Sequence, residues 1–197
     1  MDTTVFLLLT GGPTSPEICV LFAKFVATAI VPLVALALVV AWVQARPGWR
    51  PALLDAVAAA VLGLGLVQVI GWLHYRPRPF EMGLGANLLN HLPENSFPSD
   101  HATLMFALAF GLLATTSLRR AGMGLLVLAI AVSWARIYLG AHYPSDILGG
   151  AALASVCTAL IRAIQPRHRL WALCTKAYDR LICLMHLPAG LFPRGRH

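Results

Sequence analysis

The sequence is poor in charged residues. Only 12% of its 197 residues are charged and 58% are hydrophobic, whereas a soluble domain carries about 25% charged residues. Acidic residues are especially scarce, because 8 Asp and Glu stand against 15 Lys and Arg and leave a formal net charge of +7. This composition argues against an ordinary soluble domain and favours a protein that lies in a lipid bilayer.

The sequence also has little that could form a disulfide or hold a metal ion. Its four cysteines show neither a CxxC pattern nor the spacing of a Cys/His metal site; they are Cys19, Cys157, Cys174 and Cys183. We interpret them as small apolar residues of helices. The sequence therefore predicts neither a disulfide nor a metal.

Long apolar runs predict membrane-spanning helices. Five of them approach or exceed the roughly 17 to 25 residues that cross a hydrocarbon core of ~30 Å. They are 18–43, 52–73, 102–118, 123–139 and 147–164. We therefore expect an all-α membrane protein, a helical bundle of about five transmembrane helices followed by an amphipathic C-terminal helix.

No repeat or low-complexity linker divides the chain, so one transmembrane domain is expected over 18–165. The first 17 residues lack the basic region and the long apolar core of a signal peptide. We expect an interfacial segment over 1–17, although a partial span remains an alternative. Leucines at helical spacing among basic residues predict that 166–197 is a basic amphipathic tail on the cytoplasmic leaflet.

The positive charges follow a topological pattern. If the five runs cross the membrane alternately, most basic residues fall on one side, and the positive-inside rule makes that side the cytoplasm. These residues are Arg46, Arg50, Arg119, Arg120, Arg162, Arg167, Arg169, Lys176, Arg180, Arg194 and Arg196. The net charge thus reflects membrane topology, and we expect no nucleic-acid partner.

A group of polar residues is predicted at the opposite, outer membrane face. Polar groups at this depth are costly unless they pair or face water, so their convergence indicates a functional site. The residues placed there are Arg78, Ser99, His101, Arg136, His142 and Asp146. The arginines lie outside against the positive-inside bias and present donor forks that match phosphate oxygens.

The other residues of this group fit phosphoryl chemistry. Ser99 and Asp100 are suitable N-cap residues, so the helix that follows would present its first N–H groups to an anion. His142 and Asp146 are four residues apart, so the carboxylate could fix the imidazole tautomer and leave one nitrogen as nucleophile. His101 could then protonate the departing oxygen.

Three stretches resemble the motifs of the type-2 phosphatidic acid phosphatase superfamily, which are K-x6-R-P, P-S-G-H and S-R-x5-H-x3-D. Here they read GWLHYRPRP at 71–79, PSDH at 98–101 and ARIYLGAHYPSD at 135–146. The resemblance covers about 18–165, and RPF, SFPSDH and RIYLGAHYPSDILGG are most similar to the membrane undecaprenyl-diphosphate phosphatase branch.

The resemblance implies a set of catalytic roles. His142 would attack phosphorus and form a phosphohistidine, Asp146 would orient it, and His101 would protonate the leaving group. No metal or other cofactor would be required. The phosphate-binding residues would be Arg78, Arg136, Ser99, Asp100 and Arg76.

The sequence departs from the family motifs at three positions. Gly71 stands where the family has lysine, Asp100 where it has glycine, and Ala135 where it has serine. Asp100 is expected in the undecaprenyl branch, which also tolerates loss of the lysine. Arg76 is a candidate to supply the missing charge, and a contact with lipid headgroups is the alternative.

The resemblance implies hydrolysis of undecaprenyl diphosphate at the outer face of the bacterial inner membrane, which would recycle the carrier lipid for cell-wall synthesis and confer bacitracin resistance. Partners would be the polyprenyl diphosphate and the bilayer, and the oligomeric state stays open. The segment 76–100 is expected to form a long outer loop, and its polar residues, with the two glutamates first, are candidates to contact the second phosphate or to be merely solvated. They are Glu81, Asn87, His91, Glu94 and Asn95.

Two alternatives remain from the sequence. One is the same chemistry on another lipid phosphate, such as phosphatidate, phosphatidylglycerophosphate or diacylglycerol pyrophosphate, or phosphotransfer to lipid A. The other is a lipid-binding or proton-relay membrane protein in which His101, His142 and Asp146 form a path rather than an active site.

Overall fold

A computed structural model describes residues 2–12, 14–44, 46, 48–164 and 167–185, and within these ranges it holds helices and loops but no strand. The α-helices are α1 (Asp2–Leu9), α2 (Glu17–Val43), α3 (Trp49–Leu73), α4 (Asp100–Leu113), α5 (Arg119–Tyr138), α6 (Pro144–Ala163) and α7 (Arg167–Leu184). A short 3₁₀-helix, η1 (Pro79–Met82), lies in the long loop between α3 and α4. The predicted all-α membrane bundle is confirmed.

Within the described part of the chain, four helices are long and apolar enough to cross a membrane, namely α2, α3, α5 and α6. The predicted span over 102–118 is shorter than expected, because α4 has 14 residues and ends at Leu113. At 1.5 Å per residue it is about 21 Å long. The hydroxyl of Thr115 bonds the carbonyl of Leu112 at 2.9 Å, so a local side-chain bond accompanies the turn that ends the helix.

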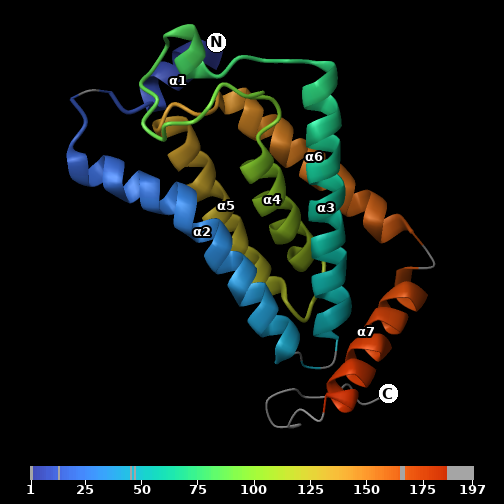
Figure 1. The fold of residues 1–197 in the computed structure, drawn as a ribbon. Helices are drawn as coiled ribbons and strands as arrows, with labels where there is room; N and C mark the ends of the chain where they lie inside the picture. The colour runs from blue at the N-terminus through green and yellow to red at the C-terminus, as the bar shows by residue number, and fades with distance from the viewer. Residues whose placement is uncertain (1, 13, 45, 47, 165–166, 186–197) are drawn as a thin grey trace.

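The short helix α4 forms the centre of the bundle. It lies between α3 and α5 with α6 behind it, and most of its residues are buried (Figure 1). Small residues allow close helix contacts: a Cβ on Gly111 of α4 would lie 2.5 Å from the Cα of Ala56 in α3. A helix surrounded in this way needs apolar residues on nearly all sides, which is why its sequence looks like a membrane span.

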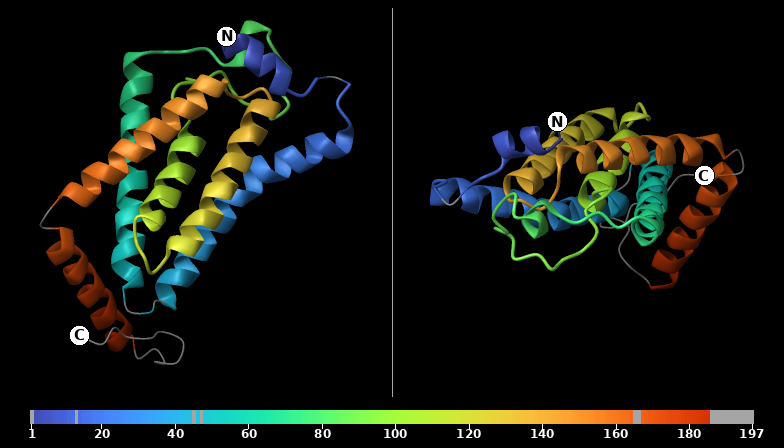
Figure 2. Two further views of the ribbon diagram at one scale, coloured as in Figure 1. Left: turned by 180° about the vertical axis from the view of Figure 1, so that it is seen from behind. Right: turned by 90° about the horizontal axis from the view of Figure 1, so that it is seen from above.

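Helices α2 and α3 approach each other at the loop that joins them and diverge toward the other end of the bundle (Figures 1 and 2). At the joining end, α7 packs against α3 as the predicted amphipathic tail helix. Arg50 pairs with Asp179 at 2.8 Å, and the indole of Trp171 donates to Asp55 at 2.7 Å. Residues 186–197 of the predicted tail lie outside the described residues.

The opposite end of the bundle, where α3 and α5 end and α4 and α6 begin, is called the site end below. Helix α1 and the long loop between α3 and α4 lie across it (Figure 2). The backbone N–H of Gly11 donates to the carbonyl of Tyr138 at 2.8 Å, and Phe6 is fully buried 5.6 Å from the ring of Tyr143. The N-terminal segment is thus part of the structure around the site.

Candidate active site

His142 lies in the loop between α5 and α6 and is almost fully buried. Its Nδ1 is 2.9 Å from the backbone carbonyl of Ser96. A carbonyl can only accept, so Nδ1 carries the proton and Nε2 has a lone pair. That Nε2 has no hydrogen-bond partner among the described residues, which is the arrangement a nucleophile needs.

The acceptor for His142 differs from the one the sequence indicated. The Oδ2 atom of Asp146 lies 3.7 Å from Nδ1, beyond hydrogen-bond distance, and the Ser96 carbonyl takes the bond instead. Burial lowers the pKa of His142 and the nearby Asp146 partly offsets this effect. The imidazole is therefore held neutral while a negative charge stands close enough to stabilise a developing imidazolium.

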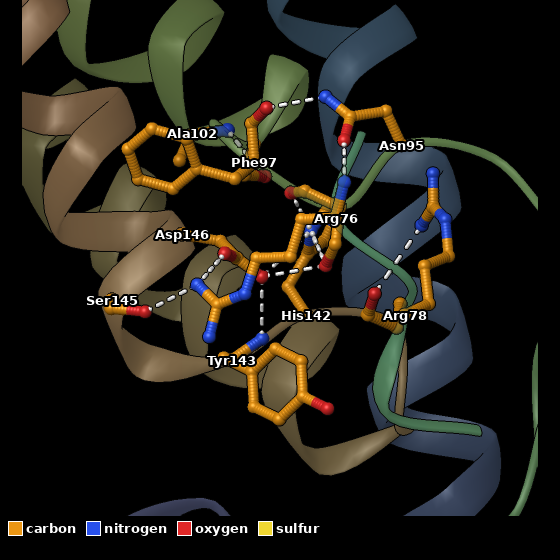
Figure 3. Close-up of polar contacts among 12 residues, drawn as sticks. Arg76, Arg78, Asn95, Phe97, Ala102, His142, Tyr143, Ser145 and Asp146 are labelled. Carbon is orange, nitrogen blue, oxygen red and sulfur yellow. Dashed lines mark hydrogen bonds and ion pairs between the residues drawn. The ribbon is translucent and has the colours of Figure 1, made fainter. Parts of the chain in front are cut away.

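Asp146 is completely buried in the first turn of α6. Its Oδ2 accepts from the hydroxyl of Ser96 at 2.6 Å and from the N–H of Tyr143 at 2.8 Å, while its Oδ1 accepts from Arg76 at 2.6 Å (Figure 3). Proline at the first helical position begins α6, and the aspartate two residues later bonds back to the backbone as in a capping box. Local helix chemistry thus fixes the carboxylate.

Ser96 is the principal site residue that the sequence reading missed. It is fully buried, its hydroxyl donates to Asp146, its carbonyl accepts from His142, and its N–H donates to the carbonyl of Arg76 at 2.8 Å. No motif spacing marks it, because its role depends on the path of the loop before α4. The only indication in the sequence was the position of Ser96, two residues before the P-S-D-H motif.

Arg76 does not stand free at the site. Its two terminal nitrogens are engaged by Asp146 and Asp2, each at 2.6 Å, and by the hydroxyl of Ser145 at 2.7 Å. Its guanidinium also lies 4.3 Å from the ring centroid of Tyr143 (Figure 3). This geometry gives no support to the prediction that Arg76 binds phosphate, since both terminal nitrogens already have partners.

Arg136 and two histidines meet on another side of the site. Arg136 is almost fully buried in the last turn of α5, and it contacts Nε2 of His91 at 2.7 Å and Nε2 of His101. Guanidinium groups only donate, so both imidazoles accept through neutral nitrogens. The structure thus brings Arg136 and His101 together and adds His91 from the outer loop.

Asp100 lies beside His101 at the beginning of α4. Its Oδ1 is 2.9 Å from Nδ1 of His101 and 2.8 Å from the backbone N–H of the same residue. A carboxylate repels phosphate, so its predicted role as a phosphate ligand has no support in this geometry. Ser99 caps α4 as predicted, since its buried hydroxyl accepts from the N–H of Ala102 at 3.4 Å.

Arg78 is nearly buried, yet its contacts are long. It donates to the carbonyl of Ala141 at 3.3 Å and to Glu94 at 3.4 Å, and its Nε has no partner among the described residues. With Glu94 and Asp100 it lines a cavity of about 630 Å³, and Gln68 and Gly71 of α3 line the same cavity. Arg78 therefore has donors to offer to a ligand in this cavity.

The remaining outer-loop candidates support the loop itself. Glu81 accepts from the backbone N–H of Arg78 at 3.0 Å and from the hydroxyl of Tyr75 at 2.7 Å. Asn95 accepts from the backbone N–H of Arg76 at 2.7 Å. The amide of Asn87 exchanges two bonds with the backbone of His91, at 2.8 and 3.0 Å. Of the five candidates, only Glu94 and His91 contact an arginine guanidinium.

These features define a membrane-embedded lipid phosphatase of the PAP2 superfamily: the chain belongs to that family, whose model matches residues 52–170. YbjG of Escherichia coli, named as a candidate undecaprenyl-diphosphatase, is 34% identical over 92% of this chain and 88% of its own length. Undecaprenyl-diphosphatase BcrC of Bacillus subtilis is 31% identical over 62% of each chain.

The fold also matches a solved structure. The crystal structure of Aquifex aeolicus LpxE superimposes with a TM-score of 0.63, covering 81% of this chain and 93% of that one. The sequence identity is 22%, so this likeness establishes the arrangement of helices. It does not bear on the substrate.

Proposed function

We propose that this protein hydrolyses undecaprenyl diphosphate to undecaprenyl phosphate and inorganic phosphate. The observation that carries this proposal is the unpartnered Nε2 of the buried His142, which lies near the Arg78 guanidinium, together with the contact between Arg136 and the His101 imidazole. Two relatives named for undecaprenyl-diphosphatase activity support the choice of substrate.

The shape of α3 also supports a lipid with a polar head and a long tail. Val57, Val61 and Leu64 line an apolar groove of about 160 Å³ between α2, α3 and α4. Gln68 and Gly71 line the polar cavity next to Arg78. Because these positions are three or four residues apart, one face of the helix leads from the polar cavity to the apolar groove. A diphosphate and its hydrocarbon chain could lie along this face.

In the proposed mechanism, Nε2 of His142 attacks the terminal phosphorus. The bond from phosphorus to the bridging oxygen breaks, and that oxygen leaves as undecaprenyl phosphate with a proton from His101. Arg78 and Arg136 hold the phosphoryl oxygens, and water then hydrolyses the phosphohistidine with His101 as base. Asp100 stabilises the protonated form of His101 that the first step requires.

The roles of Arg136 and His101 require a change of partner. In the structure, Arg136 donates to Nε2 of His101, so this nitrogen carries no proton. Phosphate oxygens are stronger acceptors for guanidinium than a neutral imidazole. Substrate binding therefore draws Arg136 away and frees Nε2 of His101 to take up the proton that it later donates.

The membrane orientation is part of the proposal. Arg46, Arg50, Arg119 and Arg120 lie at the end of the bundle opposite the site. By the positive-inside rule that end faces the cytoplasm, which places the site on the outer face of the bacterial inner membrane. The product would then return to the carrier pool for cell-wall synthesis.

The test uses the full chain in detergent. We expect phosphate release from undecaprenyl diphosphate, unchanged by EDTA, with little release from phosphatidate at the same concentration. His142→Ala should abolish both hydrolysis and the phosphoenzyme, whereas His168→Ala, on the exposed surface of α7, should retain both. Equal turnover of phosphatidate would remove the substrate assignment, and hydrolysis by His142→Ala would exclude it as the nucleophile.

A further inference from the structure

Helix α1 contributes a carboxylate to the network behind the catalytic pair. Asp2 accepts from Arg76 at 2.6 Å. The same guanidinium donates to Oδ1 of Asp146 at 2.6 Å (Figure 3). The three charges alternate in sign as negative, positive and negative. Asp146 has no exposed surface, while the side chains of Asp2 and Arg76 are 28% and 27% exposed. The chain of contacts runs from the molecular surface to the buried carboxylate.

Asp2 also holds the beginning of α6. Its Oδ1 accepts from the backbone N–H of Ser145 at 3.1 Å and its Oδ2 accepts from the hydroxyl of Ser145 at 2.5 Å. The first N–H groups of a helix have no partner within the helix, so an acidic group there stabilises the turn. Here the acceptor comes from the other end of the sequence, and the turn it stabilises carries Asp146.

The charge of Asp2 is maintained by these contacts. Although burial opposes ionisation, hydrogen bonds from Ser145 and Arg76 outweigh it and lower the pKa of Asp2 below its ordinary value. The carboxylate is therefore ionised at neutral pH and offsets part of the positive charge of Arg76. Without the Asp2 carboxylate, the positive charge of Arg76 would be balanced by Asp146 alone.

We propose that Asp2 and Arg76 are positioning residues for the Asp146–His142 pair, so that docking of α1 completes the active site. This inference rests on the proposed function of His142 as nucleophile. Arg76 orients the carboxylate through Oδ1, and Asp2 orients Arg76 and Ser145. The negative charge of Asp2 also keeps Arg76 from cancelling the field with which Asp146 stabilises the imidazolium formed on attack.

Other contacts hold α1 in place, so the charge of Asp2 can be changed without removing the helix. Phe6 is fully buried, and a Cβ on Gly85 of the outer loop would lie only 3.1 Å from its ring. The backbone of Gly11 bonds to Tyr138. Asp2→Asn removes one charge and keeps an oxygen that can accept from Ser145. Phe6→Ala instead weakens the docking of α1 and leaves the carboxylate intact.

The test measures kcat, KM and the pH dependence of kcat/KM with the full chain in detergent. For Asp2→Asn we expect kcat to fall about tenfold, the effect of losing one charge-assisted hydrogen bond to the site, with KM little changed. Asp2→Glu should restore most of the rate. Glu17→Gln, which removes a carboxylate from the exposed first turn of α2, should have no effect.

The pH profile separates an electrostatic role from a merely structural one. The acid limb of kcat/KM reports loss of the proton from His142 in the free enzyme. Asp2→Asn leaves Arg76 less compensated, so the limb should move to lower pH; Arg76→Gln removes the cation, so it should move to higher pH. Phe6→Ala should move it in the direction of Asp2→Asn. The charged or titratable groups facing His142 from the surrounding segments are unchanged in all variants: Arg78, His91, Asp100 and Asp146.

The outcomes also distinguish the two proposals. If the wild type does not hydrolyse the prenyl diphosphate, the proposed substrate is wrong. The positioning role is then tested by following the imidazole ¹⁵N chemical shifts of His142 as a function of pH. These signals are assigned by their loss in His142→Gln. The same opposite shifts are expected in that titration. An Asp2→Asn variant with wild-type kcat and an unmoved limb, or an unmoved His142 titration, would overturn the inference.

Discussion

Removal of the Ser96 hydroxyl tests how strongly the catalytic pair depends on the loop before α4. That hydroxyl donates to Oδ2 of Asp146 at 2.6 Å in a site with no exposure to solvent. In Ser96→Ala the carboxylate keeps its bonds to Arg76 and to the N–H of Tyr143 but loses one of three donors. Both side chains are fully buried, so Asp146 is held less firmly once this bond is lost.

The magnitude follows from the charge of the acceptor. A hydrogen bond to an ionised group contributes about 1.5–3 kcal/mol, and 1.36 kcal/mol corresponds to tenfold in rate. If the transition state loses the whole contribution, kcat for Ser96→Ala falls by about 10- to 100-fold. The backbone carbonyl that accepts from His142 remains, so the tautomer is preserved. The cavity beside Arg78 is not lined by Ser96, so KM should change little.

The assay is phosphate release under saturating substrate, together with the rate of phosphoenzyme formation from substrate labelled in its terminal phosphate. Ser155→Ala provides the matched control, because this hydroxyl donates to a carbonyl of its own helix at 2.7 Å on an exposed face of α6. It should leave both rates unchanged. Wild-type rates of phosphoenzyme formation in Ser96→Ala would refute the argument that this hydroxyl holds Asp146 for catalysis.

Three further predictions follow from other parts of the molecule. His101→Ala should slow substrates with strongly basic leaving groups most, and an equal loss across leaving groups would contradict its role as acid. Burial, with Arg78 and Arg136, lowers the pKa of His91 in the folded protein to about 4. The neutral ring therefore contributes its full stabilisation at pH values above the pKa of the unfolded chain. This stabilisation is lost as the pH falls through about 4. The difference in thermal stability between the wild type and His91→Asn should therefore shrink from pH 7 to pH 4, and a constant difference would contradict this. Gly111→Val places a Cβ 2.5 Å from α3 and should destabilise the bundle by about 1–3 kcal/mol or more in thermal unfolding; an unchanged melting temperature would show that the helices separate easily.

The sequence predicted the parts of the site that depend on local chemistry. The cap at Ser99 and four of the five apolar runs follow from local sequence, and the structure has them. His142 and Asp146 lie close together, but the carbonyl of Ser96 takes the hydrogen bond that the spacing suggested for the carboxylate. Family motifs then supplied roles that spacing alone leaves open. The third apolar run was misjudged in length because a buried helix and a membrane span have the same apolar composition.

Residues whose placement depends on the loops were beyond sequence reasoning. Ser96 acts through one side-chain and two backbone contacts, and nothing in its neighbourhood specifies that the loop returns to α6. Asp2 lies 144 positions before Asp146, and only the docking of α1 brings it to Arg76. Arg76 was a candidate to replace the charge of the family lysine, with a headgroup contact as the alternative, whereas its partners in the structure are Asp2, Asp146 and Ser145.

The hydrogen-bond partners of Arg76, Arg78 and Arg136 indicate which of these arginines can bind a phosphate. Arg76 is fixed between Asp2 and the buried Asp146, and an incoming phosphate would have to separate two charged pairs to recruit it. Arg136, in contrast, donates to neutral imidazole nitrogens, and Arg78 has only long contacts with a carbonyl and an exposed glutamate. Phosphate can replace these weaker acceptors at lower cost. The difference in partners therefore divides the arginines into one that maintains the nucleophile's surroundings and two that can turn to the substrate.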